Sequence, residues 1–107
     1  KQGRSWCIGK GFDASAPIGP ITPIDQAGDI AKAAIWLQVN GADRQRSTVA
    51  QLIWNIAETI EHLSAAWELA PGDLIYTGTP EGVGAVVRGD TLEGGVDGLT
   101  PLRLSVV

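Results

Sequence analysis

Eight consecutive residues, AIWLQVNG at positions 34–41, decide the fold. Apolar side chains at every second position alternate with Trp36 and Gln38, which is the pattern of a β-strand that buries one face. The strand ends at Asn40-Gly41, the strongest short hairpin signal, because both residues tolerate the positive φ angles of a tight turn. The stretch therefore predicts a strand, a two-residue turn and a return strand over 42–46.

A helix is predicted after this hairpin. Thr48 and Gln51 have the spacing of a capping box, in which two side chains satisfy free N–H groups at a helix start. From Val49 to Trp67, apolar residues recur mostly three or four positions apart, which indicates one helix face turned toward a core. The helix should end before Pro71-Gly72, because proline and glycine both terminate helices.

The rest of the chain reads as short strands and turns. Strands are expected near 6–8, 74–76, 86–87, 91–96 and 102–107. The segment 15–29 contains three prolines and is expected to be an irregular connector. The order of elements predicts an α+β fold, mainly β, with one principal helix packed on a sheet.

Composition and charge narrow the classes of function. The 107 residues carry a net charge of −4 and no basic cluster, which argues against a nucleic-acid-binding surface. No apolar run is long enough to span a membrane. The single cysteine, Cys7, cannot form an internal disulfide, so a reducing, cytoplasmic compartment is expected. The sequence begins at Lys1 in mid-pattern and contains no methionine, from which we expect the C-terminal part of a longer protein.

The segment GDLIYTGTPEGVG at 72–84 places hydroxyl groups and glycines directly after a short apolar run. Glycine lets a backbone approach a ligand closely, because it lacks a Cβ and tolerates positive φ. The hydroxyls of Thr77 and Thr79, with nearby N–H groups, suit an anion-binding concavity. From these residues alone, a tight turn between strands without a ligand explains the pattern equally well.

A second glycine-rich segment, GKGFDASAPIGP at 9–20, carries a single lysine. Together with TGTPEGVG at 77–84, it resembles the fumarylacetoacetate hydrolase family, and most of all the branch of fumarylpyruvate and acylpyruvate hydrolases. Shorter matches are Val39-Asn40-Gly41, Arg44-Gln45 and Leu52-Ile53-Trp54. The resemblance extends from about Gly9 to the end, so we interpret residues 1–107 as the C-terminal portion of a single catalytic domain of this family. It implies a β-roll body of mixed sheets.

The resemblance implies roles for three residues of this chain. The lysine of the family's Lys-Gly-Phe motif points into the active site, which makes Lys10 the catalytic candidate, with an ammonium that would stabilise an enolate. The second threonine of the Thr-Gly-Thr-Pro motif contacts the substrate carboxylate, so Thr79 is expected to bind substrate while Gly78 leaves room. Taken alone, Lys10 reads as a surface lysine and Thr79 as a turn residue that bonds its own backbone.

Other polar residues have weaker assignments. Ala14 departs from the threonine that many members carry there, and a one-residue shift points Ser15 the other way. Arg44 and Gln45 follow the hairpin turn, where they either approach the site or decorate an edge strand. His62 is expected to form a solvated pair with Glu58 on the polar helix face.

The activity implied by the resemblance is metal-dependent hydrolysis of a carbon–carbon bond in a small 2,4-diketo acid, such as fumarylpyruvate or another acylpyruvate. The family uses one divalent metal, usually Mg²⁺ or Mn²⁺. Its ligands precede the lysine motif, so they are expected upstream of Lys1 and none within this chain. The resemblance also implies a homodimer, with Trp36 or Trp54 as candidates for its interface.

Two other functions stay open at this point. One is isomerisation or decarboxylation of hydroxylated dienedioates in aromatic catabolism, a sister activity of the same family. The other is a non-catalytic module that binds a small acid or a protein partner.

Overall fold

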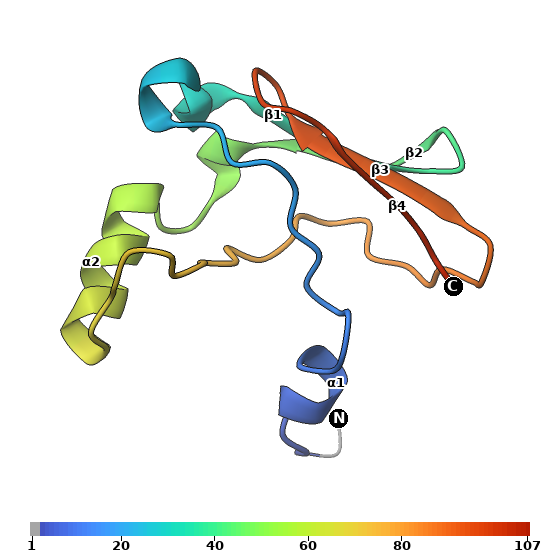
Figure 1. Cartoon of the computed structure of the whole chain (residues 1–107), viewed down its shortest axis with the longest axis horizontal. Helices are drawn as coiled ribbons and strands as arrows, with labels where there is room; N and C mark the ends of the chain where they lie inside the picture. The colour runs from blue at the N-terminus through green and yellow to red at the C-terminus, as the bar shows by residue number, and fades with distance from the viewer. Residues whose placement is uncertain (1–2) are drawn as a thin grey trace.

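The computed structural model describes residues 3–107 and contains one antiparallel sheet of four strands in the order β2-β1-β3-β4 (Figure 1). The strands are β1 (Ala34–Val39), β2 (Ala42–Thr48), β3 (Thr91–Val96) and β4 (Leu102–Ser105). Two α-helices, α1 (Cys7–Lys10) and α2 (Ile56–Ala66), accompany the 3-10 turns η1 (Ile24–Gln26), η2 (Ile30–Lys32) and η3 (Val49–Gln51). The predicted class, α+β and mainly β with one principal helix, is confirmed.

The hairpin of β1 and β2 forms as predicted. Asn40 and Gly41 have φ angles of 52° and 81°, as a two-residue turn that matches strand twist requires. The return strand is longer than expected and continues to Thr48. It also contains a β-bulge, because Leu37 pairs with Gln45 whereas Gln38 pairs with Asp43. Arg44 is the extra residue of this bulge.

One end of the sheet is tied together by side chains. Asn40 donates from Nδ2 to Asp90 Oδ1 at 2.8 Å and accepts at Oδ1 from the Thr91 N–H at 2.9 Å. The Val87 N–H donates to Asp90 Oδ2 at 2.9 Å. The Val87 N–H and, next, the Asn40 amide lower the pKa of Asp90 below its ordinary value. These bonds join the β1–β2 turn to the start of β3.

The predicted helix start was wrong. Thr48 precedes the short η3 turn without capping it, and α2 begins only after Asn55. Asn55 and Glu58 make the capping box: Glu58 N–H donates to Asn55 Oδ1 at 2.8 Å, and Asn55 N–H donates to Glu58 Oε2 at 2.9 Å. Leu52 is extended, with ψ 135°, which ends η3 and prevents one continuous helix from Val49. The helix does end before Pro71-Gly72, as predicted.

Several predicted strands are also absent from the part of the chain that the structure describes. The segment around 6–8 enters α1 instead, because Cys7–Lys10 form one helical turn. Residues 74–76 and 86–87 run without regular structure, and Tyr76 is exposed. A strand needs a neighbour for its N–H and C=O groups, and none pairs with these residues in residues 3–107. β4 ends at Ser105 rather than at residue 107.

Little apolar surface is buried within this chain. Ala27 and Val39 are the buried apolar residues of the described part, whereas Ile53 is 97% exposed. α2 stands apart from the sheet (Figure 1), so the prediction that it packs on the sheet was wrong. Among the described helices, none combines the length and the apolar character needed to cross a membrane.

Candidate functional site

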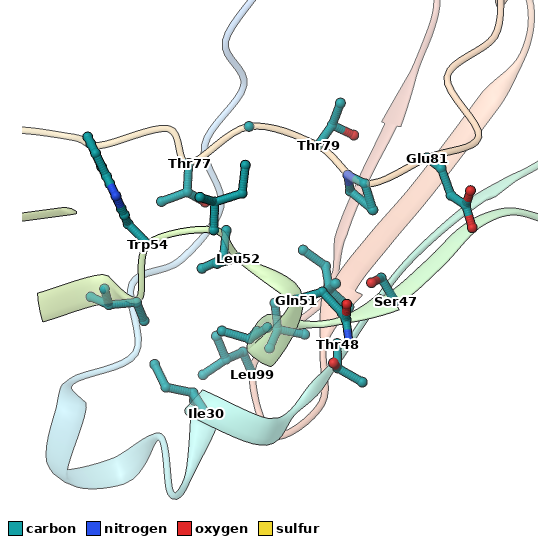
Figure 2. A pocket seen from close by; sticks show the side chains of 17 residues that line it. Ile30, Ser47, Thr48, Gln51, Leu52, Trp54, Thr77, Thr79, Glu81 and Leu99 are labelled. Atoms are coloured by element: carbon teal, nitrogen blue, oxygen red, sulfur yellow. The ribbon is translucent and has the colours of Figure 1, made fainter. Parts of the chain in front are cut away.

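A cavity of about 1010 Å³ lies where four parts of the chain meet (Figure 2). The loop Thr77–Glu81 lies along one side, and residues 51–54, which lead toward α2, lie along another. The floor comes from Ile30 in η2 and from the sheet, through Ile35, Ser47 and Val96. Figure 2 shows the hydroxyl of Thr79 on the loop and the indole of Trp54 at the far end. The cavity therefore offers mainly apolar walls with a few polar groups, which come from the loop and from Ser47, Thr48 and Gln51, as small-molecule sites do.

The structure brings two of the three predicted site residues to this cavity. Gly78 and Thr79 both line it. Gly78 has φ +90°, and a Cβ built there would meet nothing within 4 Å, so the backbone faces open space. Lys10 is not among the lining residues. It lies in α1, where its Nζ is 5.7 Å from the centre of the Trp6 ring.

The segment around Lys10 is shaped by Ser15. The Ser15 hydroxyl donates to the Lys10 carbonyl at 3.2 Å and accepts from the Phe12 N–H at 3.2 Å. Ala14 has φ +55°, in the left-handed region. Ser15 therefore holds the turn that follows Lys10 and supplies no hydroxyl in place of the threonine expected at position 14.

The loop that carries Thr79 is fastened to β2 by Gln45 and Arg44. Gln45 donates from Nε2 to Thr79 Oγ1 at 2.8 Å, to the Pro80 carbonyl at 2.8 Å and to the Glu81 carbonyl at 3.3 Å. Arg44 donates to the Ala85 carbonyl at 3.3 Å. The sequence left open whether Arg44 and Gln45 approach the site, and in the structure both residues hold the loop that lines the cavity.

Two glycines allow this close contact. A Cβ at Gly82, which has φ +99°, would lie 2.5 Å from the carbonyl oxygen of Arg44 and 3.2 Å from Cγ of Gln45. A Cβ at Gly84 would lie 2.8 Å from the Arg44 guanidinium. Gly82 thus lets the loop pack on the backbone of β2, and Gly84 leaves room for the Arg44 guanidinium.

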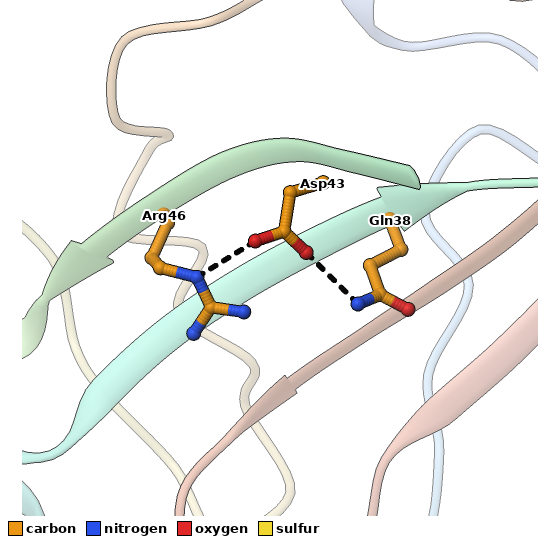
Figure 3. A network of polar contacts seen from close by, with 3 residues as sticks. All are labelled: Gln38, Asp43 and Arg46. Carbon is orange, nitrogen blue, oxygen red and sulfur yellow. Dashed lines mark hydrogen bonds and ion pairs between the residues drawn. The ribbon is translucent and has the colours of Figure 1, made fainter. Parts of the chain in front are cut away.

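A polar network on the opposite face of β2 lies outside the cavity (Figure 3). Asp43 Oδ2 accepts from Arg46 Nε at 2.9 Å, and Asp43 Oδ1 accepts from Gln38 Nε2 at 2.8 Å. The Arg46 bond and then the Gln38 bond lower the pKa of Asp43, while Asp43 raises the pKa of Arg46. The three side chains satisfy one another at the surface.

The predicted pair of His62 with Glu58 is replaced by other contacts. Glu58 is engaged in the capping box with Asn55. The His62 ring stacks on Trp54, with ring centres 4.1 Å apart and planes inclined by 20°. His62 therefore supports the Trp54 wall of the cavity.

Within residues 3–107, no group of three or more histidine, cysteine or acidic side chains gathers as a metal site. Hard divalent cations bind several carboxylate or carbonyl oxygens together. The donor set of the described residues therefore does not fit such a cation.

Known proteins with similar sequences and structures include several enzymes. The family model described as fumarylacetoacetate (FAA) hydrolase C-terminal matches residues 1–107. Fumarylpyruvate hydrolase of Ralstonia sp. is 48% identical over 105 residues, which is 98% of this chain and 54% of that protein. This chain thus spans about half the length of that relative.

The solved structures with a similar fold include two enzymes. Fumarylpyruvate hydrolase from Pseudomonas aeruginosa in complex with Mn²⁺ and pyruvate has a TM-score of 0.93 and 60% identity, over 98% of this chain and 45% of that one. 5-Carboxymethyl-2-hydroxymuconate delta-isomerase from Mycobacterium smegmatis has a TM-score of 0.90 and 41% identity, over 96% of this chain and 40% of that one.

Proposed function

Because the chain belongs to the fumarylacetoacetate hydrolase family, we propose that the full protein hydrolyses a carbon–carbon bond in a 2,4-diketo acid such as fumarylpyruvate. One observation carries the proposal: the Gly78-Thr79 loop lines the cavity in a chain 60% identical to an enzyme solved with pyruvate. Pyruvate is a 2-keto acid, and the same keto-carboxylate end is present in every acylpyruvate.

The proposed reaction adds water across the bond between C3 and C4. The oxygen of water joins the C4 carbonyl carbon, and the C3–C4 bond then breaks. Its electron pair passes to the pyruvate fragment as an enolate, which takes up a proton to give pyruvate, while C4 leaves in a carboxylic acid. The protein must therefore hold a carboxylate and stabilise an enolate.

We assign the carboxylate to Thr79 and the enolate to Lys10. A hydroxyl suits a carboxylate because it donates a charge-assisted hydrogen bond, and Gly78 keeps the approach open. The ammonium group of Lys10 would favour the developing enolate charge. In this structure Lys10 lies over the Trp6 ring. Its proposed role therefore requires α1 to lie against the cavity during turnover.

A divalent cation, Mg²⁺ or Mn²⁺, is part of the proposal because the relative was solved with Mn²⁺. Such a cation polarises carbonyl oxygens. The described residues do not gather ligands for it, so its ligands would come from outside them. The roles assigned to this chain concern the carboxylate and the enolate alone.

The test is turnover by the full-length protein with Mg²⁺ or Mn²⁺ and several acylpyruvates. We expect loss of the diketo acid together with equimolar pyruvate, measured by chromatography. Thr79→Val should raise KM about 10-fold, because a hydrogen bond to a charged group is lost while the shape is kept. Thr79→Ser should retain most of the affinity. Binding of the acids without any metal-dependent turnover would overturn the proposal and favour a non-catalytic module.

A second candidate is isomerisation of a hydroxylated dienedioate. It is favoured by the similarity to the Mycobacterium smegmatis isomerase. An isomerase returns a product of unchanged mass, whereas a hydrolase adds the mass of water and yields two acids. Mass spectrometry of the products therefore separates the two reactions. The expected homodimer stays a prediction, which light scattering of the full protein would check.

A further inference from the structure

We infer that Gln45 is a positioning residue, which fixes the Thr79 hydroxyl as a hydrogen-bond donor toward a carboxylate in the cavity. The inference rests on the proposed function, because it concerns the site that would hold the 2-keto acid. It gives a defined role to a residue of β2, beside the Lys10 segment and the Thr79 loop, to which the sequence assigned roles.

The orientation of the Gln45 amide follows from its neighbours. Its terminal nitrogen lies 2.8 Å from the Pro80 carbonyl oxygen and 3.3 Å from that of Glu81. Carbonyl oxygens only accept hydrogen bonds, so the group that faces them must be the NH₂ end. The same nitrogen lies 2.8 Å from Thr79 Oγ1. Thr79 therefore accepts a hydrogen bond from Gln45.

This arrangement determines what the Thr79 hydroxyl can do. A hydroxyl has one hydrogen to donate and two lone pairs that accept. Because one lone pair is occupied by Gln45, the hydroxyl hydrogen points away from the amide and is available to another acceptor. An ionised carboxylate only accepts. The pair thus suits a carboxylate ligand, and a chain of donors from Gln45 through Thr79 strengthens that bond.

The position of Gln45 depends on the bulge in β2. Neighbouring residues of a regular strand point to opposite faces, yet Arg44 and Gln45 both bind the segment 79–85. The extra residue Arg44 makes this possible, since a bulge re-aims side chains. Gln45 is also only partly exposed, so its bonds compete less with water than those of a surface amide.

The test compares four forms of the full-length protein: wild type, Gln45→Leu, Thr79→Val and the double variant. Binding of pyruvate by calorimetry and KM for an acylpyruvate are measured for each. Gln45→Leu should weaken both about 10-fold, with kcat changed much less. The double variant should bind no worse than Thr79→Val alone, because Gln45 acts through that hydroxyl.

If Gln45 only held the loop in place, without orienting the Thr79 hydroxyl, the result would differ. Loss of Gln45 would weaken binding further in the Thr79→Val background, so multiplying effects would overturn the inference. Gln45→Glu is the second variant, nearly identical in shape but lacking the donors, and should weaken pyruvate binding in the same direction. Arg46→Leu is the control on the same strand, since Arg46 pairs with Asp43 away from the loop, and should bind normally.

The outcomes also separate this inference from the proposed function. Normal turnover with unchanged KM and pyruvate affinity in both Gln45 variants would overturn the inference and leave the hydrolase intact. Pyruvate binding that depends on Gln45 in a protein without hydrolysis would support the inference and remove the hydrolase. A wild-type protein that binds no 2-keto acid would overturn both.

Discussion

The sheet and the segments outside it are held together in different ways. In the sheet, strands pair with one another, and Asn40 and Asp90 close one end with three side-chain bonds. The outer segments, defined here as residues 3–16 and 67–87, contain no strand in the described chain. They are held by side-chain hydrogen bonds, such as that of the Tyr76 hydroxyl to the Ala16 carbonyl at 3.1 Å and those of Gln45 to the Thr79 loop.

The difference separates stability from function. Regions with few buried contacts open at low cost, and binding loops are commonly drawn from them. The proposed site residues Lys10, Gly78 and Thr79 all lie in the outer segments. Apart from Gln45, which contacts the Thr79 loop, changes in the sheet should therefore alter unfolding, whereas changes in the outer segments should alter catalysis. Four substitutions in the full-length protein test this division, in order of decreasing effect.

Lys10→Ala should have the largest effect. Removing a cation that stabilises the enolate should lower kcat by about 10² to 10³, while the circular dichroism and melting temperature stay unchanged because Lys10 is exposed. Steady-state kinetics of the full-length protein measure the change in kcat. Lys32→Ala, an exposed lysine of η2, is the control. Wild-type kcat in Lys10→Ala would remove Lys10 from the mechanism.

Gly82→Ala should release the Thr79 loop from β2. The new Cβ would meet the Arg44 carbonyl at 2.5 Å, so we expect KM to rise about 10-fold without unfolding the sheet. Gly72→Ala is a matched control, because Gly72 has a similar φ of +96° but open space around the Cβ position. Equal KM values for the two variants would mean that contact with β2 does not position the loop.

Asn40→Ala should affect stability alone. It removes the bonds to Asp90 and Thr91 and places alanine at φ 52°, which should lower the free energy of unfolding by about 1–2 kcal/mol. Urea unfolding measures the change. Asn40→Gly keeps the turn conformation but loses the bonds, so its free energy of unfolding should lie between those of wild type and Asn40→Ala. An effect on KM larger than that on stability would contradict the division.

Asp90→Asn should have the smallest effect, and one that depends on pH. The pKa of Asp90 is lowered in the folded protein, so its charge stabilises the fold above the ordinary pKa of 3.8. That contribution is lost as the pH falls through the folded value. The melting temperatures of wild type and variant should therefore differ near neutral pH and converge in acid. A constant difference across this range would show that the charge of Asp90 is not responsible.

The hairpin of the sheet could be predicted because its signals are local. The apolar alternation in 34–39 and the Asn40-Gly41 turn each depend on a few neighbouring residues. The predicted start of α2 was wrong because the sequence contains two capping patterns, one at Thr48 and one at Asn55. Only the one at Asn55 is followed by an uninterrupted helix. The strand predicted at 74–76 was wrong because an apolar run becomes a strand only when a neighbour pairs with it.

The candidate site was predictable to a similar extent. The glycines and hydroxyls of 77–79 indicated a ligand loop, and Gly78 and Thr79 do line the cavity. The sequence singled out Arg44 and Gln45 but left open whether they approach the site, because the direction of the Gln45 side chain depends on a bulge whose position no short pattern reveals. The stacking of His62 on Trp54 likewise joins residues on either side of the helix start.

The bulge at Arg44 reverses the alternation of side chains in β2, so that odd-numbered residues before and after it lie on opposite faces of the sheet. In an unbroken strand Asp43, Gln45 and Ser47 would share a face. With the extra residue, Asp43 instead faces the same way as Arg46, which is why two residues three apart in a strand form an ion pair. The Asp43 carboxylate therefore lies on one side of the sheet, whereas Gln45 and the cavity-lining Ser47 lie on the other.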